Sequence, residues 1–212
     1  MSGRRLFVPS ERMAAGRARL APADLHYLRD VLRLGPGAPV EVFDGAGGVH
    51  EGRLAGDDLL LGPRREAPPP AARVHLAFAL ARGERCDLVV QKATELGASR
   101  ILPFEAARSV VRLDPARGAE RQRRWQRIAA EAARQCGRAD VPGVAPPGAL
   151  VDRSAAGHVA VVGPEGGLAP EEVLACLAAG ARLATLGPRI LRFETAAIAA
   201  VALVQYLAGD MG

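Results

Sequence analysis

The sequence of 212 residues contains no asparagine, and among its 28 basic residues only Lys92 is a lysine. Aromatic residues make up only 4% of the chain. Positive charge is therefore carried by guanidinium groups, which suit phosphate recognition. Genomic codon bias is the plain explanation for the excess of arginine. The net charge of +5 and the sequence pI near 9.8 also suggest a nucleic-acid partner.

Long apolar runs and paired cysteines are missing as well. The longest apolar run, Ala196 to Val204, is far shorter than the ~18 residues of a membrane span. No apolar segment follows the first residues, so we expect no secretory signal. Cys86, Cys136 and Cys176 form no Cys-x-x-Cys pair, and the four histidines are scattered, which disfavours a zinc site. The sequence predicts a soluble, cytoplasmic protein without a metal or a membrane anchor.

The first third of the sequence is typical of a small β-rich domain. We expect a helix over 22–32 and short strands over 5–8, 40–43, 49–54 and 59–61. Asp44-Gly45 and Gly47-Gly48 predict a hairpin turn between two of these strands. Pro68-Pro69-Pro70 then breaks the pattern. We therefore divide the chain into a small barrel over 1–70 and a second domain over 71–212.

Beyond residue 70, strands and helices alternate. The expected strands are 74–80, 101–104, 159–162 and 182–186, with 109–112 extending or following the second. The expected helices are 85–96, 120–136, 170–179 and 194–207. This order is typical of an α/β domain with a mostly parallel sheet, in which ligands bind at the loops after the strands' carboxyl ends. The arginine-rich face of the helix over 120–136 is either solvated or turned toward RNA.

Two loops occupy such positions. Gly163-Pro164-Glu165-Gly166-Gly167 exposes backbone groups, but it lacks the endings of a phosphate loop and of a dinucleotide fingerprint. It is therefore either a tight turn or a ligand loop. In the second loop, Arg189 and Arg192 flank Ile190-Leu191, and Glu194-Thr195 opens an alanine-rich helix. These groups suit a flat heterocyclic ligand beside an anionic one.

Taken together, the two loops resemble the motifs of the SPOUT methyltransferases. The first loop is followed about twenty residues later by Leu186-Gly187-Pro188-Arg189-Ile190-Leu191-Arg192-Phe193-Glu194-Thr195-Ala196. Further motifs are Val31 to Gly37, Phe43-Asp44-Gly45, Lys92 to Gly97, Arg108-Ser109-Val110 and Gln135 to Arg138. Their combination resembles the family that methylates N3 of a uridine in 16S ribosomal RNA, over almost the whole chain.

The resemblance implies a fold, a cofactor and partners. The fold is α/β, with a trefoil-knotted parallel-sheet domain of SPOUT type at the C-terminus and a PUA-like RNA-binding β-barrel at the N-terminus. The cofactor is S-adenosylmethionine, and the substrate is 16S ribosomal RNA within the small subunit. The protein is expected to be a homodimer with the site near the interface.

The resemblance also implies which residues hold the cofactor, mainly through the backbone of the two loops. They are Gly163, Pro164, Glu165, Gly166, Gly167, Leu186, Gly187, Arg189, Ile190, Leu191, Thr195 and Ala196. For catalysis we expect Arg108 or Arg192 to stabilise the uridine anion. Glu194 is either a base or orienting group, or a cap of the last helix. Arg192 has the alternative of pairing with Glu165.

RNA binding is expected to rest on phosphate contacts. The first choices in the N-terminal domain are Arg4, Arg5, Arg29 and Arg33. Phe7 either stacks on a base or belongs to the barrel core.

The chain departs from the family pattern near 149–158, where it is short and one sheet strand is missing. Two alternatives to the main reading therefore stay open. One is a catalytically impaired RNA-binding protein of the same fold, and the other is a SPOUT methyltransferase for a different RNA nucleotide.

Overall fold

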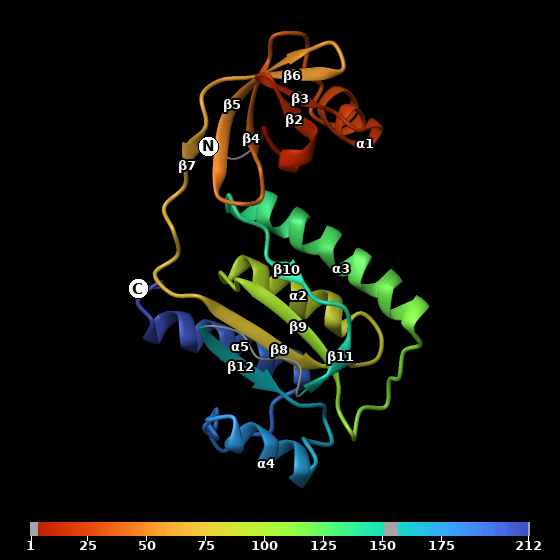
Figure 1. Ribbon diagram of the computed structural model, residues 1–212, viewed down its shortest axis with the longest axis vertical. Helices are drawn as coiled ribbons and strands as arrows, with labels where there is room; N and C mark the ends of the chain where they lie inside the picture. The colour runs from red at the N-terminus through yellow and green to blue at the C-terminus, as the bar shows by residue number, and fades with distance from the viewer. Residues whose placement is uncertain (1–3, 151–156, 212) are drawn as a thin grey trace. The chain divides into compact units, whose positions relative to one another are not determined.

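The computed structural model describes residues 4–150 and 157–211, and its elements fall into two units (Figure 1). The first unit comprises the residues up to Pro69 together with Ala133–Val141. The second comprises Pro70–Ala132 and the residues from Pro142 onward. Helix α3 (Pro115–Cys136) begins in the second unit, and its last residues belong to the first.

The first unit is a curled sheet that resembles a PUA-like barrel. Its strands are β1 (Arg5–Phe7), β2 (Met13–Ala14), β3 (Arg17–Arg19), β4 (Pro39–Phe43), β5 (Gly48–Ala55), β6 (Asp58–Leu61) and β7 (Arg65–Glu66). Their order is β1-β4-β5-β6-β3-β2, and β7 pairs with β5. β1 is parallel to β4, whereas the other pairs are antiparallel. The predicted hairpin between β4 and β5 is confirmed.

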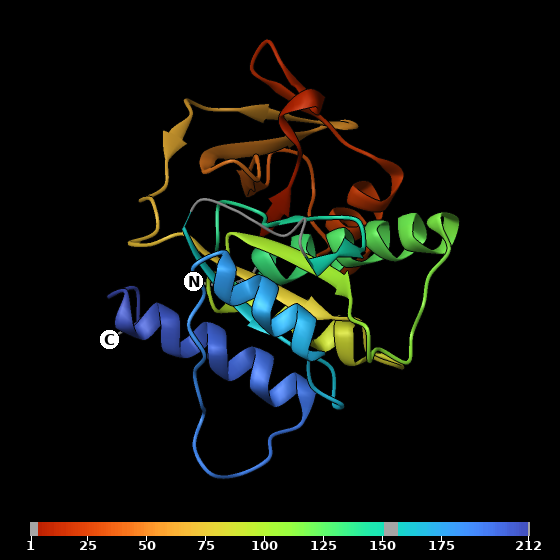
Figure 2. The same ribbon diagram turned by 60° about the horizontal axis from the view of Figure 1, so that its bottom comes forward.

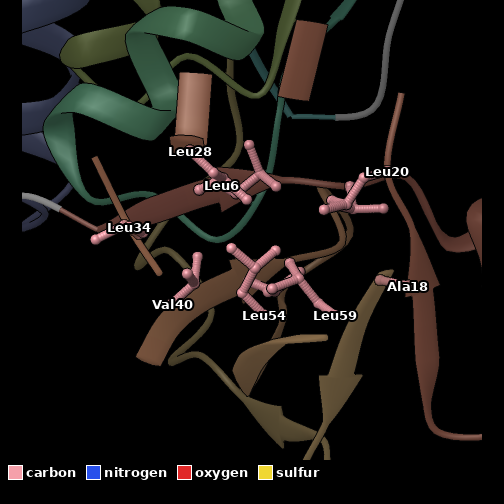
Figure 3. Close-up of a cluster of buried hydrophobic side chains, with 10 residues drawn as sticks. Leu6, Ala18, Leu20, Leu28, Leu34, Val40, Leu54 and Leu59 are labelled. Carbon is pink, nitrogen blue, oxygen red and sulfur yellow. The ribbon is translucent and has the colours of Figure 1, made fainter. Parts of the chain in front are cut away.

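Strand alternation explains where the core of this unit lies. Val40, Leu54 and Leu59 occupy one face of the sheet and are buried together with Leu6 and Leu28 (Figure 3). Because successive side chains of a strand point to opposite faces, their neighbours in sequence lie on the other face. On that other face Phe7 and Phe43 pack near Ala133 and Ala139 in a smaller cluster.

The helical segment predicted over 22–32 is confirmed in extent, but it is not a uniform α-helix. α1 (Pro22–His26) continues directly into the π-helix η2 (Tyr27–Val31), so that the N–H of Leu32 donates to the carbonyl of Tyr27 at 2.9 Å. Arg33 follows with φ at +53°. A short 3-10 turn, η1 (Ser10–Arg12), also lies in this unit, and the sequence analysis did not anticipate it.

The second unit contains the expected parallel sheet. Its strands are β8 (Val74–Ala79), β9 (Arg100–Glu105), β10 (Gly143–Val144), β11 (Gly148–Ala149) and β12 (His158–Val162). The order is β10-β9-β8-β12, β11 also pairs with β9, and every pairing is parallel. The two shortest strands arise in the proline-rich connection, where no strand was predicted.

Helices α2 (Arg85–Glu95), α4 (Pro170–Ala178) and α5 (Phe193–Leu207) complete this unit. Phe78 of β8 packs edge-on against Trp125 of α3 and Phe193 of α5, both at 6.0 Å between ring centroids. The helix predicted over 85–96 is confirmed as α2, and it ends before Gly97, whose φ is +88°. Such a left-handed residue ends a helix at little cost only when it is glycine.

Two local predictions are wrong. Residues 109–112 form no strand. The segment 182–186 is irregular, and residues 181–192 project from the sheet as a long loop in which Leu183 is exposed (Figure 2). Apolar alternation gives a strand only where a neighbouring edge supplies hydrogen bonds.

α3 itself begins earlier than predicted, because Asp114 accepts the N–H of Arg117 at 3.0 Å and caps the helix ahead of Pro115.

The trefoil knot stays a prediction. The shortened region near 149–158 lies largely in 151–156, outside the described residues. Within the described residues, no helix is long and apolar enough to cross a bilayer.

Candidate functional site

The carboxyl ends of β8, β9 and β12 meet at one edge of the sheet, because these strands are mutually parallel. Three segments leave the sheet there. Arg85 begins α2 after β8, Arg108 follows β9, and Gly163 to Gly167 follow β12. Ligands of open parallel sheets bind at this edge, so we take these segments as the candidate site.

The loop after β12 depends on its glycines. Gly167 has φ at +73°, and its N–H donates to the carbonyl of Pro164 at 2.8 Å, which closes a tight turn. A Cβ at Gly163 would lie 3.0 Å from Cγ of Leu168. A side chain at either position would therefore strain the turn. The loop thus holds its backbone, free of intervening side chains, at the carboxyl edge.

Glu172, in the first turn of α4, binds the backbone directly after this loop and the backbone after β9. Its Oε2 accepts the N–H of Ala169 at 2.8 Å, and its Oε1 accepts the N–H of Ala107 at 2.8 Å. The first bond caps α4. The second joins the helix start to the segment after β9, which is 65 residues away in sequence. The spacing after Pro170 predicts the capping role, but no sequence signal predicts the bond to Ala107.

Two arginines contact the same loop. Arg108 Nη1 donates to the carbonyl of Gly166 at 3.0 Å. Arg85 forms an ion pair with Glu165. Glu165 therefore pairs with Arg85, and the alternative pairing with Arg192 is wrong. Arg85 was not among the predicted site residues. The predicted strand over 74–80 and helix over 85–96 already place it at the first turn after that strand.

The second predicted loop is not brought against the first. Leu186, Gly187, Arg189 and Ile190 lie in the irregular segment, and the side chain of Ile190 is fully exposed. Among the described residues, no hydrogen bond or ion pair joins this loop to Gly163–Gly167. Of the predicted cofactor residues beyond it, Leu191 is half-buried, and Thr195 and Ala196 lie in the first turns of α5.

Glu194 has an unusual environment at the start of α5. The N-cap position belongs to Arg192, and no side chain makes a capping hydrogen bond there. Oε2 of Glu194 is buried and has no hydrogen-bond partner among the described residues. The interpretation of Glu194 as a helix cap is therefore wrong. A buried, unpaired acceptor is costly, which makes this oxygen a candidate for contact with a ligand's donor.

Cys86 lies close to the same edge and is unsuited to act as a nucleophile. Its Sγ accepts the N–H of Ala81 at 3.3 Å inside the core. Burial raises the pKa of the Cys86 thiol, so the thiol stays neutral at physiological pH. No three acidic, histidine or cysteine side chains gather to hold a metal in the described part of the chain.

The predicted RNA-binding residues of the first unit have different environments. The guanidinium of Arg5 is largely buried over the Phe43 ring and is bonded to Glu41. Phe7 packs against Phe43, with 5.4 Å between ring centroids. Arg29 is bonded to Gly56 and Asp57. Arg4 and Arg33 are exposed.

Two family models match the chain. The RNA methyltransferase domain matches residues 68–152 and 149–205, and the RNA methyltransferase PUA domain matches residues 20–60. Ribosomal RNA small subunit methyltransferase E of Mycobacterium bovis is 34% identical over 213 residues, covering 84% of this chain and 81% of the relative.

Solved structures agree with the sequence relatives. Ribosomal RNA small subunit methyltransferase E from Neisseria gonorrhoeae, bound to S-adenosylmethionine, is 30% identical with a TM-score of 0.84 and covers 96% of this chain and 97% of that one. A protein from Legionella pneumophila, solved with the bound cofactor S-adenosylmethionine, is 28% identical with a TM-score of 0.84 and the same coverage. The chain therefore belongs to the ribosomal RNA small subunit methyltransferase E family.

Proposed function

We propose that this chain transfers a methyl group from S-adenosylmethionine to N3 of a uridine in 16S ribosomal RNA of the small subunit. The observation that carries the proposal is the glycine loop after β12, which Arg108 bonds from the neighbouring segment at the carboxyl edge of the sheet. Relatives with the same family name and neighbours that hold the cofactor support it.

The residues present fit the cofactor at the first loop. Gly163 to Gly167 present backbone groups, Gly163 and Gly167 carry no side chain of their own, and Oε2 of Glu194 has no hydrogen-bond partner among the described residues. When bound, the cofactor supplies an electrophilic methyl group on a sulfonium sulfur. The proposed set also includes Leu186, Gly187, Arg189, Ile190, Leu191, Thr195 and Ala196. In this proposal the exposed second loop closes over the ligand.

The chemistry explains why arginine is needed. Uridine N3 carries a proton, and it attacks a methyl group only after that proton has left. N3 then forms the new N–C bond in line as the S–C bond breaks and its electron pair returns to sulfur. The protein must align the two atoms and stabilise the charge that develops on O2 and O4 of the base. We assign the second role to Arg108 or Arg192, and proton acceptance or orientation to Glu194.

The same proposal assigns functions to the two parts of the chain. Residues 1–70 bind RNA and residues 71–212 carry out methyl transfer. Arg4, Arg5, Arg29 and Arg33 contact phosphates, and Phe7 is the candidate for stacking on a base. The location is the cytoplasm, where the small subunit is assembled.

We also propose that the active form is a homodimer. None of the nine residues of α4 is buried, although the helix is mostly apolar, and Leu174 is 64% exposed. Apolar side chains are likewise exposed near the end of α5, at Leu203, Tyr206 and Leu207. Exposed apolar side chains on a helix are typical of interaction sites, and the alanine face of α5 permits a close approach of a second copy.

The test has two steps. Calorimetric titration with S-adenosylmethionine measures cofactor binding, and incubation with small subunits that lack the modification, followed by mapping of the methylated base, measures transfer. Cofactor binding and transfer to uridine N3 are expected. Transfer to another nucleotide would overturn the substrate alone. Absence of both heat and transfer would favour the catalytically impaired RNA-binding protein.

A further inference from the structure

The sheet of the first unit has an open groove on the face opposite its core. The core takes Val40, Leu54 and Leu59 from β4, β5 and β6 (Figure 3). Strand alternation therefore turns their neighbours Glu41, Arg53 and Leu60 to the other face. A cavity of about 680 Å³ lies there, and its lining includes Arg4, Pro39, Glu41, Glu51, Arg53 and Leu60. That volume falls within the ~300–1,000 Å³ typical of ligand sites.

Two carboxylates face each other across this groove. The register of β4 and β5 places Glu41 directly opposite Glu51. Like charges in this position destabilise a sheet. Glu41 is compensated by Arg5, whose Nε lies 2.5 Å from its Oε1. Among the described residues the Glu51 side chain, which is 83% exposed, contacts only Arg65, at 3.4 Å. Glu51 is thus a hydrogen-bond acceptor in the groove, and its repulsion from Glu41 lowers the stability of the sheet.

The remaining lining suits a nucleotide. Pro39 also lies opposite Arg53, and Arg53 lies opposite Leu60, which is 44% exposed although apolar. A guanidinium plane beside an aliphatic side chain offers a surface on which a base can stack. Arg4 is exposed; its carbonyl accepts the N–H of Glu41, and its side chain has no hydrogen-bond or ion-pair partner within residues 4–150 and 157–211. Its charge is therefore free for a phosphate.

We propose that this groove binds an unpaired guanosine of the RNA substrate, away from the nucleotide that is methylated. An ionised carboxylate only accepts hydrogen bonds, so the base must present donors. Guanine places N1–H and the 2-amino group side by side, and this pair matches the two oxygens of Glu51. Uracil presents one N–H between two carbonyls, which the carboxylates repel. Arg4 then takes the adjoining phosphate. The inference rests on the proposed RNA substrate, but it concerns a different surface.

The test measures binding of short single-stranded RNAs to the full chain by fluorescence anisotropy. The probes are an oligouridine, the same oligouridine with one central guanosine, and a version with inosine, which lacks the 2-amino group. The guanosine probe is expected to bind about tenfold more tightly than the other two. Glu51→Gln should abolish this preference. Arg4→Gln should weaken all three probes alike, because a phosphate contact carries no base information.

Glu11→Gln is the matched control, since Glu11 is exposed and lies outside the groove; it should keep the preference. Glu51→Gln removes the repulsion toward Glu41, so its thermal unfolding should occur at the same or a higher temperature. Equal binding of the three probes, or an unchanged preference in Glu51→Gln, would overturn the inference. Methyl transfer without the preference defeats this inference alone, whereas the preference without methyl transfer defeats only the proposed activity.

Discussion

Arg108 Nη1 lies 3.0 Å from the carbonyl oxygen of Gly166, so that an arginine after β9 holds the loop after β12 across 58 positions of sequence. The bond uses one N–H of the guanidinium. No other hydrogen bond of this side chain is found within the described ranges, and the residue is exposed. One side chain can therefore fix the loop and still meet negative charge on a substrate.

Replacing Arg108 tests this double role. Arg108→Ala should lower single-turnover methyl transfer about 100-fold, because a preorganised donor to the developing charge is lost. Cofactor affinity should fall only a few-fold, since one hydrogen bond to the loop disappears. Quench-flow measurements give the first quantity and calorimetry the second. Arg123→Ala, on an exposed face of α3, should change neither. Unchanged single-turnover transfer in Arg108→Ala would remove this residue from the mechanism.

The ion pair between Arg85 and Glu165 predicts a charge-swap effect. Both side chains are about half exposed, at 47% and 51%, so the pair contributes modestly. Arg85→Glu should weaken cofactor binding about threefold to fivefold by repelling Glu165 from its place. The double variant Arg85→Glu with Glu165→Arg should recover most of that affinity. Calorimetry on the four proteins gives the coupling. If the loss of cofactor-binding free energy in the double variant equals the sum of the losses in the two single variants, the pair does not position the loop.

Glu194→Met should separate stability from activity. The substitution removes a buried, unpaired oxygen that costs about 1–3 kcal/mol. It also removes a favourable charge at the helix start, which contributes about 0.3–1 kcal/mol. The first effect is larger, so the free energy of unfolding should be unchanged or raised while turnover falls at least about tenfold.

Chemical denaturation and methyl-transfer rates measure the two quantities for Glu194→Met. Glu171→Met in the first turn of α4 is the control, because Glu171 is exposed and has only the helix-start effect. The free energy of unfolding of Glu171→Met should fall by a few tenths of a kcal/mol, and its turnover should be unchanged. A clear loss of stability in Glu194→Met would mean that the carboxylate has a structural partner.

Asp44 predicts an acid-dependent loss of stability. Burial by itself raises the pKa of Asp44, but hydrogen bonds from the N–H groups of Ala46 and Gly48 and the charge of Arg64 outweigh it, so the folded-state pKa lies below the ordinary value of 3.8. The carboxylate therefore stabilises the fold above pH 3.8. This contribution is lost as the pH falls from there through the lower folded-state pKa.

Asp44→Asn should lower the free energy of unfolding by about 1–2 kcal/mol at neutral pH and by progressively less as the pH falls. Urea unfolding at a series of pH values measures the difference from the parent protein. The control is Asp57→Asn, at a side chain that is 77% exposed. Its free energy of unfolding should stay within about 0.5 kcal/mol of that of the parent protein at every pH. A constant difference between parent and Asp44→Asn across this pH range would contradict the assignment.

The exposed apolar surface of α4 predicts self-association. Leu174→Asp should convert a dimer into a monomer in light scattering at micromolar concentration, because an unpaired charge is costly in an apolar interface. Leu88→Asp on α2, at a 40% exposed position, should leave the mass of the dimer unchanged. A parent protein that is monomeric at all concentrations would refute the proposed homodimer.

Local patterns in the sequence were sufficient for most helices and strands. The spacing of buried positions and the glycine stop at Gly97 gave α2, the turn residues after Phe43 gave the β4–β5 hairpin, and alternating elements gave the parallel sheet. These signals are local, because caps, turns and periodicity act within a few residues. The motif combination also identified the family, although no single motif was sufficient.

Pairing and side-chain contacts between distant residues were decided only by the tertiary structure. Residues 182–186 have the apolar pattern of a strand but pair with no strand among the described residues, whereas the proline-rich connection forms β10 and β11 by pairing with β9. The partner of Glu165 and the second bond of Glu172 likewise join segments far apart in the chain. A sequence specifies which groups are available; which of them meet depends on the packing that buries the core, because hydrogen bonds and ion pairs act only over a few ångströms.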